Sequence, residues 1–220
     1  MIAAIEDNAF GIAGVAPGAE LLAIPVCAPV GASLGDECRM FDVLRGIDRA
    51  WQEDARIVNL ALVGPPDPLL ERAVDRLRTF GILVVAAAGN ESGDAPRYPA
   101  AYASVIGVGA ADARGRRWPR SNRGPWVTLI APGTEILSTT PGDAFAFGDG
   151  TSLAAAHVTG MLAVLLGSQA GPEDVRSAFL EAARRASAKG GPAILPKLCD
   201  VLPTLGARCP SPGPAAKPTR

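Results

Sequence analysis

Short runs of apolar residues alternate along the first half of the chain with longer segments whose apolar positions recur every three or four residues. The runs are Leu21–Val26, Ile57–Leu62, Ile82–Ala87 and Ser104–Ala110. Their length and their content of Val, Ile, Leu and Ala are typical of strands buried on both faces. Because such strands occur in parallel sheets that helices cover on each side, the pattern predicts an α/β fold.

Two of the intervening segments are predicted to be helices with clear ends. Residues 39–52 place Met40, Val43, Leu44, Ile47, Ala50 and Trp51 on one stripe. The second helix has Asp67 as its N-cap and Pro68 at its first position, and it stops at Gly81. The strand–helix–strand order implies right-handed crossovers between parallel strands.

The pattern changes in the second half of the chain. Short strands are predicted at 127–130, 135–139 and 144–147, followed by a helix from Ser152 and another from Pro172. Beyond residue 202 the sequence is rich in Pro, Ala and Gly. We therefore expect one folded unit over residues 1–202 and a disordered tail over 203–220.

Charge and cysteine content narrow the function classes. The 220 residues carry 21 Lys and Arg against 22 Asp and Glu, which argues against a nucleic-acid groove or an anionic membrane surface. No apolar run approaches the roughly 20 residues of a membrane span. The cysteines form two near pairs, Cys27 with Cys38 and Cys199 with Cys209, and fit either two local disulfides or four buried thiols. Their spacing and the single histidine argue against a zinc site.

The segment Gly150-Thr-Ser-Leu-Ala-Ala-Ala-His-Val-Thr-Gly160 carries the clearest candidate chemistry. It places Ser152 after a glycine turn, in the first turn of an apolar helix. There the backbone N–H groups and the positive end of the helix dipole surround the hydroxyl, which suits a nucleophile whose attack creates an oxyanion. The alternative is that Thr151 or Ser152 merely caps the helix.

This segment resembles the nucleophile motif of the subtilisin-like serine proteases, Gly-Thr-Ser-Met-Ala-Ala/Ser-Pro-His-Val-Ala-Gly. Leu153 and Ala156 depart from it. Further stretches match the family in order and spacing: Ile57-Val-Asn-Leu-Ala-Leu-Val-Gly, Val84-Val-Ala-Ala-Ala-Gly-Asn-Glu, Tyr98-Pro-Ala and Ser121-Asn-Arg-Gly. The resemblance covers Ile2 to about Ala186. It implies a three-layer fold with a mainly parallel central sheet and helices on both faces.

The resemblance also implies roles for individual residues. Ser152 would be the nucleophile, and the Asn90 side chain and the Ser152 backbone N–H would bind the oxyanion. The residues expected to bind a polypeptide substrate are Ala61, Leu62, Val63, Gly64, Ala88 and Gly89. Val63 stands where the family usually has Gly. The alternative for Asn90 is an ordinary turn residue after a glycine.

A base for Ser152 is not evident. The family carries its aspartate in Asp-Ser/Thr-Gly and its histidine in His-Gly-Thr, and neither motif occurs here. The single histidine, His157, lies on the predicted helix of Ser152, turned roughly 140° away and about 7.5 Å along the axis, so it is assigned a structural role. The resemblance implies a chain that begins after the histidine motif and lacks the N-terminal strands.

Such a fragment of a serine endopeptidase would be inactive alone. An N-terminal fragment or a pro-segment would be its polypeptide partner. The alternative hypothesis is a non-catalytic peptide-binding or regulatory module of the same family. The family resemblance further implies a secreted or cell-envelope protein.

No cofactor is required by this chemistry. The acidic stretch Glu6-Asp7-Asn8 falls where many family members carry a calcium loop, and its oxygen atoms suit a structural Ca²⁺. The alternative is a solvated acidic loop, because one short cluster supplies few of the 6–8 oxygen ligands that Ca²⁺ takes.

Overall fold

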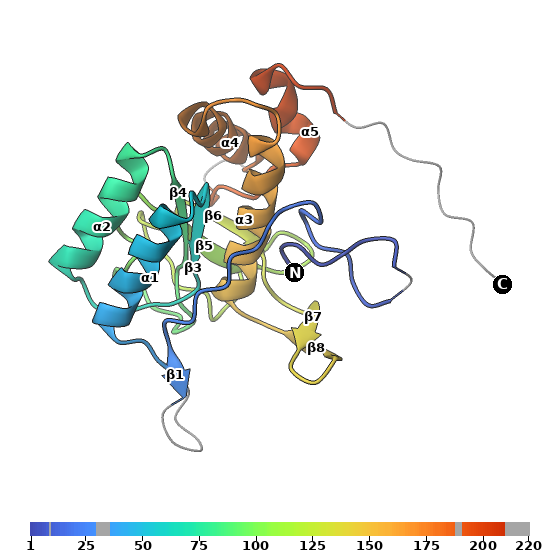
Figure 1. Cartoon of the computed structure of the whole chain (residues 1–220). Helices are drawn as coiled ribbons and strands as arrows, with labels where there is room; N and C mark the ends of the chain where they lie inside the picture. The colour runs from blue at the N-terminus through green and yellow to red at the C-terminus, as the bar shows by residue number, and fades with distance from the viewer. Residues whose placement is uncertain (9, 30–35, 188–190, 210–220) are drawn as a thin grey trace.

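A four-stranded parallel sheet forms the centre of the molecule (Figure 1). The computed structural model describes the chain except for residues 9, 30–35, 188–190 and 210–220. The strands are β3 (Ile57–Leu60), β4 (Leu83–Ala87), β5 (Ile106–Ala111) and β6 (Leu129–Pro132), in spatial order β3-β4-β5-β6. Every residue of β4 and β5 is buried, as the continuous apolar runs predict.

Helices cover both faces of this sheet (Figure 1). On one face, α1 (Met40–Gln52) and α2 (Pro68–Thr79) pack over Val58, Leu60 and Val84. On the other, α3 (Thr151–Leu166) and α4 (Pro172–Ala186) pack over Leu83, Val85 and Val108. The three-layer α/β architecture expected from the sequence is therefore confirmed.

The helix ends follow local chemistry. Asp67 Oδ1 accepts hydrogen bonds from the N–H groups of Leu69 (2.8 Å) and Leu70 (3.0 Å), and this N-cap starts α2. In contrast, α3 has buried residues around its whole circumference, because it lies between the sheet and α4. Its apolar sequence thus reflects a central position.

Smaller elements complete the fold. They are β1 (Ala28–Pro29) paired with β2 (Asp36–Glu37), the hairpin of β7 (Ile136–Thr140) and β8 (Ala144–Gly148), α5 (Leu198–Val201) and the 3-10 helix η1 (Leu202–Leu205). Disulfides join Cys27 to Cys38 and Cys199 to Cys209, which decides between the two readings of the cysteines. The ordered chain extends past the expected boundary at residue 202, because η1 packs on the core and a disulfide holds Cys209. Residues 210–220 lie outside the described residues.

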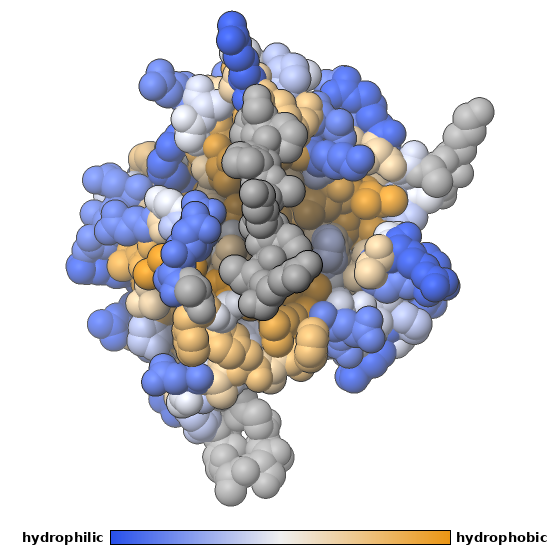
Figure 2. Space-filling view, turned by 90° about the vertical axis from the view of Figure 1, so that its right-hand side faces the viewer, coloured by the Kyte–Doolittle hydropathy of each residue, from blue (hydrophilic) through white to orange (hydrophobic). Residues whose placement is uncertain are grey.

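The N-terminal segment packs along α3 through a tight contact. The N–H groups of Gly14 and Ala16 donate to the carbonyls of Ala4 (2.8 Å) and Ile2 (2.8 Å). A Cβ atom on Gly160 of α3 would lie 2.6 Å from Val15 Cβ, so only glycine permits this approach. Figure 2 shows hydrophobic residues gathered at the middle of the face that the right-hand side of Figure 1 presents, with hydrophilic residues at its rim.

One predicted strand is wrong. Leu21–Val26 is extended chain without strand pairing, and Leu21 and Leu22 are 63% and 46% exposed. The physical reason is the lack of a neighbour: the sheet begins at β3, and no described backbone hydrogen bond joins Leu21–Val26 to it. An apolar run becomes a strand only where its backbone groups find a ladder partner.

Candidate active site

The candidate residues meet at the carboxyl edge of the sheet. β3 leads into Ala61–Gly64, β4 leads into Ala88–Asn90, and α3 begins beside them at Thr151. In parallel sheets this edge is where ligands bind, because the loops that follow the strands converge there. The fold therefore brings together three segments that lie 24 to 90 residues apart in the sequence.

Thr151 connects the loop after β4 to the start of α3. Its N–H and its hydroxyl both donate to Asn90 Oδ1, at 3.0 and 2.9 Å, and its Oγ1 accepts from the Gly89 N–H at 3.0 Å. Thr151 is only 1% exposed, so these bonds are shielded from water. They fix the rotamer of Asn90 by occupying its oxygen.

The Asn90 amide nitrogen points to the same place as the Ser152 hydroxyl. A Cβ atom built on Gly150 would lie 3.1 Å from Ser152 Oγ and 3.6 Å from Asn90 Nδ2. Both atoms therefore lie close to the Cα of Gly150, and the Ser152 backbone nitrogen lies 3.8 Å from the same Cβ position. A hydroxyl, an amide donor and helix N–H groups in one spot form the arrangement that stabilises an oxyanion.

Asn122 holds the Asn90 loop in place, a role that the sequence reasoning missed. Its Nδ2 donates to Ala88 O (3.0 Å) and to Glu91 Oε2 (2.5 Å), and its Oδ1 accepts from the N–H groups of Glu91 (3.1 Å) and Gly93 (2.9 Å). The residue is 1% exposed. Its only signal in the sequence is the Ser121-Asn-Arg-Gly stretch, which says nothing about which loop the side chain reaches.

His157 lies away from the Ser152 hydroxyl. Its Nδ1 is 3.1 Å from the Leu153 carbonyl, one turn back on α3, and since a carbonyl only accepts, Nδ1 carries the proton. Burial lowers the pKa of His157 below its usual range, although hydrogen bonds to the carbonyls of Leu153 and Pro132 oppose that effect. The described contacts of this ring are with the backbone carbonyls of Leu153 and Pro132.

The expected substrate-binding residues follow β3 and β4 at the same edge of the sheet. Gly64 pairs with Tyr98 in a short antiparallel bridge, with N···O distances of 2.7 and 3.1 Å, which anchors the end of the Ala61–Gly64 segment. Val63 is 39% exposed, so its side chain is available to a ligand. Ala88 and Gly89 are buried behind Asn90.

No group of three or more His, Cys, Asp or Glu side chains that could hold a metal ion occurs among the described residues. In the stretch expected to bind calcium, Asn8 Oδ1 accepts a hydrogen bond from the Phe10 N–H at 3.1 Å. A structural Ca²⁺ at this stretch stays a prediction. Within the described part of the chain, no helix is long and apolar enough to cross a membrane.

Comparison with known proteins places this arrangement in a wider group. Residues 1–198 match the model of the subtilase family of peptidases. The chain is 38% identical over 160 residues to Subtilisin Savinase of Lederbergia lenta, covering 72% of this chain and 58% of that protein. It is 35% identical over 189 residues to thermitase of Thermoactinomyces vulgaris, covering 86% of this chain and 66% of that one. It spans 41% of the M-protease of Shouchella clausii (strain KSM-K16).

Solved structures agree. The protease domain of PatA superimposes with a TM-score of 0.81 at 30% identity, covering 91% of this chain and 76% of that domain. The self-cleaved form of that domain gives a TM-score of 0.80 at 31% identity, covering 92% and 80%. Sequence, fold and the residues gathered at the carboxyl edge of the sheet lead to one conclusion: the chain belongs to the subtilase family.

Proposed function

We propose that this chain carries the nucleophile and the oxyanion donors of a serine endopeptidase acting on polypeptides. The observation that supports the proposal most strongly is the placement of Ser152 Oγ and Asn90 Nδ2 against the same bare Cα of Gly150. The chain belongs to the subtilase family and is similar to proteases, and this similarity supports a peptide bond as the target of Ser152.

The reaction divides into two halves. In acylation, Ser152 Oγ bonds to the scissile carbonyl carbon as its proton passes to a base, and the carbonyl oxygen becomes an oxyanion held by Asn90 Nδ2 and the Ser152 N–H. The C–N bond then breaks, and the proton goes to the leaving amine. Water releases the acyl group in the second half and restores the serine.

His157 does not supply the base that accepts the proton of Ser152. Its ring is held at Leu153 O, and no other histidine occurs in the 220 residues. A serine hydroxyl without a base is a weak nucleophile. We therefore propose that a further polypeptide segment brings the base and its carboxylate, and that the 220 residues alone hydrolyse peptides slowly.

A complementation assay tests this proposal. The 220-residue chain is incubated with a fluorogenic peptide, alone and with a separately produced polypeptide that carries the family motifs Asp-Ser/Thr-Gly and His-Gly-Thr. We expect hydrolysis above background only in the mixture. Ser152→Ala should abolish it, and Asn90→Ala should lower kcat about 10²–10³-fold. Hydrolysis by the mixture that survives in Ser152→Ala would contradict the proposal.

The second candidate is a peptide-binding module without hydrolysis. The position of His157 is the observation that favours it, because the cleft residues persist without an adjacent base. Under this alternative the wild-type chain and Ser152→Ala bind a peptide equally, and no added segment produces turnover. We also propose an exported protein, since its two disulfides are stable in oxidising compartments.

A further inference from the structure

Arginines gather in the segment that follows β5, residues 112–123, which we call the arginine loop. It holds one acidic residue, Asp112, and five of the 21 basic residues of the chain. These five are Arg114, Arg116, Arg117, Arg120 and Arg123. Five positive charges less one negative charge give the loop a formal charge of +4, whereas the whole chain carries −1. Such a concentration of one sign attracts groups of the opposite charge.

The one carboxylate of the arginine loop is used to close the loop's own turn. Asp112 Oδ1 accepts from the N–H groups of Arg114 and Arg116, both at 2.9 Å, and its Oδ2 accepts from Arg116 Nε at 2.8 Å. The Asp112 N–H in turn donates to the Arg116 carbonyl at 2.8 Å. The turn is therefore already ordered, and a ligand that binds here does not have to order it.

The other guanidinium groups of the arginine loop are not neutralised by carboxylates. In the described part of the chain, the only ion pair of this loop joins Arg116 to Asp112 at 2.7 Å. Arg117 and Arg123 donate to backbone carbonyls, which carry no formal charge. Most of the positive charge of the loop is thus available to a ligand.

Arg114 and Arg120 are the two arginines of the loop that face solvent without an ion pair among the described residues. The guanidinium carbon of Arg120 lies 5.5 Å from the centre of the Trp118 ring. This contact covers one face of the guanidinium group and leaves the N–H groups at its edge free to donate. Arg120 is therefore positioned to bind a carboxylate from solvent.

The arginine loop is joined to the segment that carries Asn90. The Ser92 N–H donates to the Arg120 carbonyl, and the Arg123 N–H donates to the Gly93 carbonyl, both at 2.9 Å. Two residues of chain, at most about 7 Å, separate Asn90 from Ser92. The arginines therefore lie within reach of a few residues of any polypeptide that is held beside Asn90.

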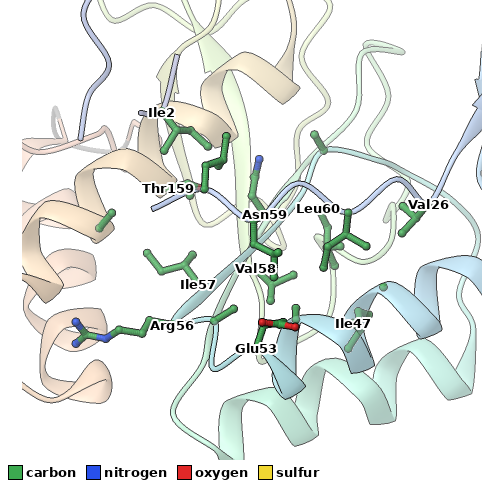
Figure 3. A pocket seen from close by; sticks show the side chains of 18 of the residues that line it. Ile2, Val26, Ile47, Glu53, Arg56, Ile57, Val58, Asn59, Leu60 and Thr159 are labelled. Atoms are coloured by element: carbon green, nitrogen blue, oxygen red, sulfur yellow. The ribbon is translucent and has the colours of Figure 1, made fainter. Parts of the chain in front are cut away.

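The amino edge of the sheet has the opposite charge. Arg56 stands just before β3, beside a cavity of about 810 Å³, and its Nη1 donates to the Leu166 carbonyl at 3.2 Å (Figure 3). Three acidic residues, Glu20, Glu53 and Asp54, line the same cavity. The excess of positive charge is therefore specific to the arginine loop at the carboxyl edge, where the candidate active site lies.

We infer that the arginine loop is a docking surface for an acidic segment of the polypeptide substrate, whose Asp or Glu side chains pair with Arg114 and Arg120. The inference rests on the proposed function for the identity of this polypeptide as the substrate. A planar guanidinium group can bind a carboxylate through two parallel hydrogen bonds. An acidic polypeptide is favoured over a nucleic acid, because the loop adjoins a site proposed for peptide bonds and the chain as a whole is not basic.

Peptide binding measured without turnover tests the docking surface. The protein is the Ser152→Ala chain, and the probe is the peptide Gly-Glu-Glu-Ala-Glu-Glu-Ala-Gly with an uncharged fluorescent label. The reference peptide has Gln in place of every Glu. At low salt, fluorescence anisotropy should show that the Glu peptide binds about tenfold more tightly than the Gln peptide. At about 1 M salt the difference should disappear, because charges are then screened beyond roughly 3 Å.

Variants of the protein locate the binding to the arginine loop. Arg114→Gln/Arg120→Gln should weaken binding of the Glu peptide about three- to tenfold, since two ion pairs are lost. Arg114→Lys/Arg120→Lys keeps both charges and should restore most of the affinity. The matched control is Arg45→Gln/Arg72→Gln, at exposed positions of α1 and α2. It removes the same charge from another surface and should leave the affinity nearly unchanged.

Three results would overturn the inference. They are equal affinity for the two peptides, equal weakening by the two pairs of Gln substitutions, and tighter binding of a single-stranded oligonucleotide that carries as many charges as the Glu peptide. The complementation assay separates this inference from the proposed function. Charge-dependent binding of the Glu peptide without hydrolysis in that assay would leave the docking surface in place and contradict the proposed endopeptidase. Hydrolysis without charge-dependent binding would do the reverse.

Discussion

At the scale of single residues, the side chain of Asn122 fixes the loop that carries Asn90. Its one amide group serves four partners in the loop that carries Asn90. Removing it leaves the buried Ala88 carbonyl and the part-buried N–H groups of Glu91 and Gly93 without partners. A buried group left without a partner costs about 1–3 kcal/mol. The position of Asn90 therefore depends on a side chain that never touches the reacting atoms.

Asn122→Ala should lower the free energy of unfolding by about 2–4 kcal/mol, since one buried carbonyl and two part-buried N–H groups lose their partners together. Urea unfolding followed by tryptophan fluorescence measures this change. The matched control is Asn8→Ala, which removes one hydrogen bond at an exposed turn and should cost no more than about 0.5 kcal/mol. Equal losses in the two variants would contradict the role assigned to Asn122.

His157 should make stability depend on pH. Its pKa in the folded state lies below the unfolded value because of burial, so the unfolded chain binds the proton more readily. Stability from this group is present above the unfolded pKa of about 6.5 and is lost as the pH falls below it. Between pH 7.5 and 5.5, the wild-type chain should lose more unfolding free energy in urea than His157→Gln. Parallel losses in the two proteins would refute the effect.

At the scale of elements, the contact between α3 and the N-terminal segment reverses an ordinary rule. Replacing glycine by alanine inside a helix usually stabilises by about 0.5–1 kcal/mol. At Gly160 the new Cβ would meet Val15 at 2.6 Å, so the segment must move away. The sign of the change in stability caused by Gly160→Ala thus shows whether the N-terminal segment packs against α3.

Gly160→Ala should lower the melting temperature, because the clash with Val15 outweighs the gain in helix propensity. Differential scanning calorimetry measures the shift. Gly18→Ala is the control, since a Cβ atom there meets nothing within 4 Å and should be neutral or slightly stabilising. A higher melting temperature for Gly160→Ala would show that the N-terminal segment is not held as described.

The sequence predicts well the elements that depend on neighbouring residues in the chain or on burial on every side. The N-cap at Asp67 and the all-apolar strand Ile82–Ala87 need no distant information, and both appear in the structure. Leu21–Val26 has the same apolar pattern yet forms no strand, because pairing depends on a neighbour that the local sequence does not specify. Asn122 was missed for the same reason: the groups it binds lie about 30 residues earlier. Ser152 and Asn90 became candidates through a family resemblance, whereas the residue pattern alone favoured a helix cap at Ser152 and allowed a turn residue at Asn90.

At the scale of the whole molecule, the two disulfides lie in different regions. One joins residues that precede α1, and the other joins residues near the C-terminal end. Each bridge spans a short loop, with sequence separations of 11 and 10. In the chain-entropy account, loops of this size contribute about 2–3 kcal/mol each. Similar contributions to stability are therefore expected from bridges with different structural roles.

The Cys27→Ser/Cys38→Ser and Cys199→Ser/Cys209→Ser proteins should each lose about 2–3 kcal/mol of unfolding free energy, measured by urea unfolding. The matched control is the wild-type chain under the same non-reducing conditions. An unchanged free energy of unfolding in either variant would contradict the contribution expected from that bridge.

The position of α3 has a consequence for how the molecule matures. This helix contacts all four strands of the central sheet, whose residues precede it by roughly 20 to 95 positions in the chain. Contacts between such distant segments form late, since long loops must close before they are rewarded. A newly made chain therefore does not bring Ser152 and Asn90 together while its sheet is incomplete. The proposed nucleophile and its proposed oxyanion donor meet only once the domain is compact.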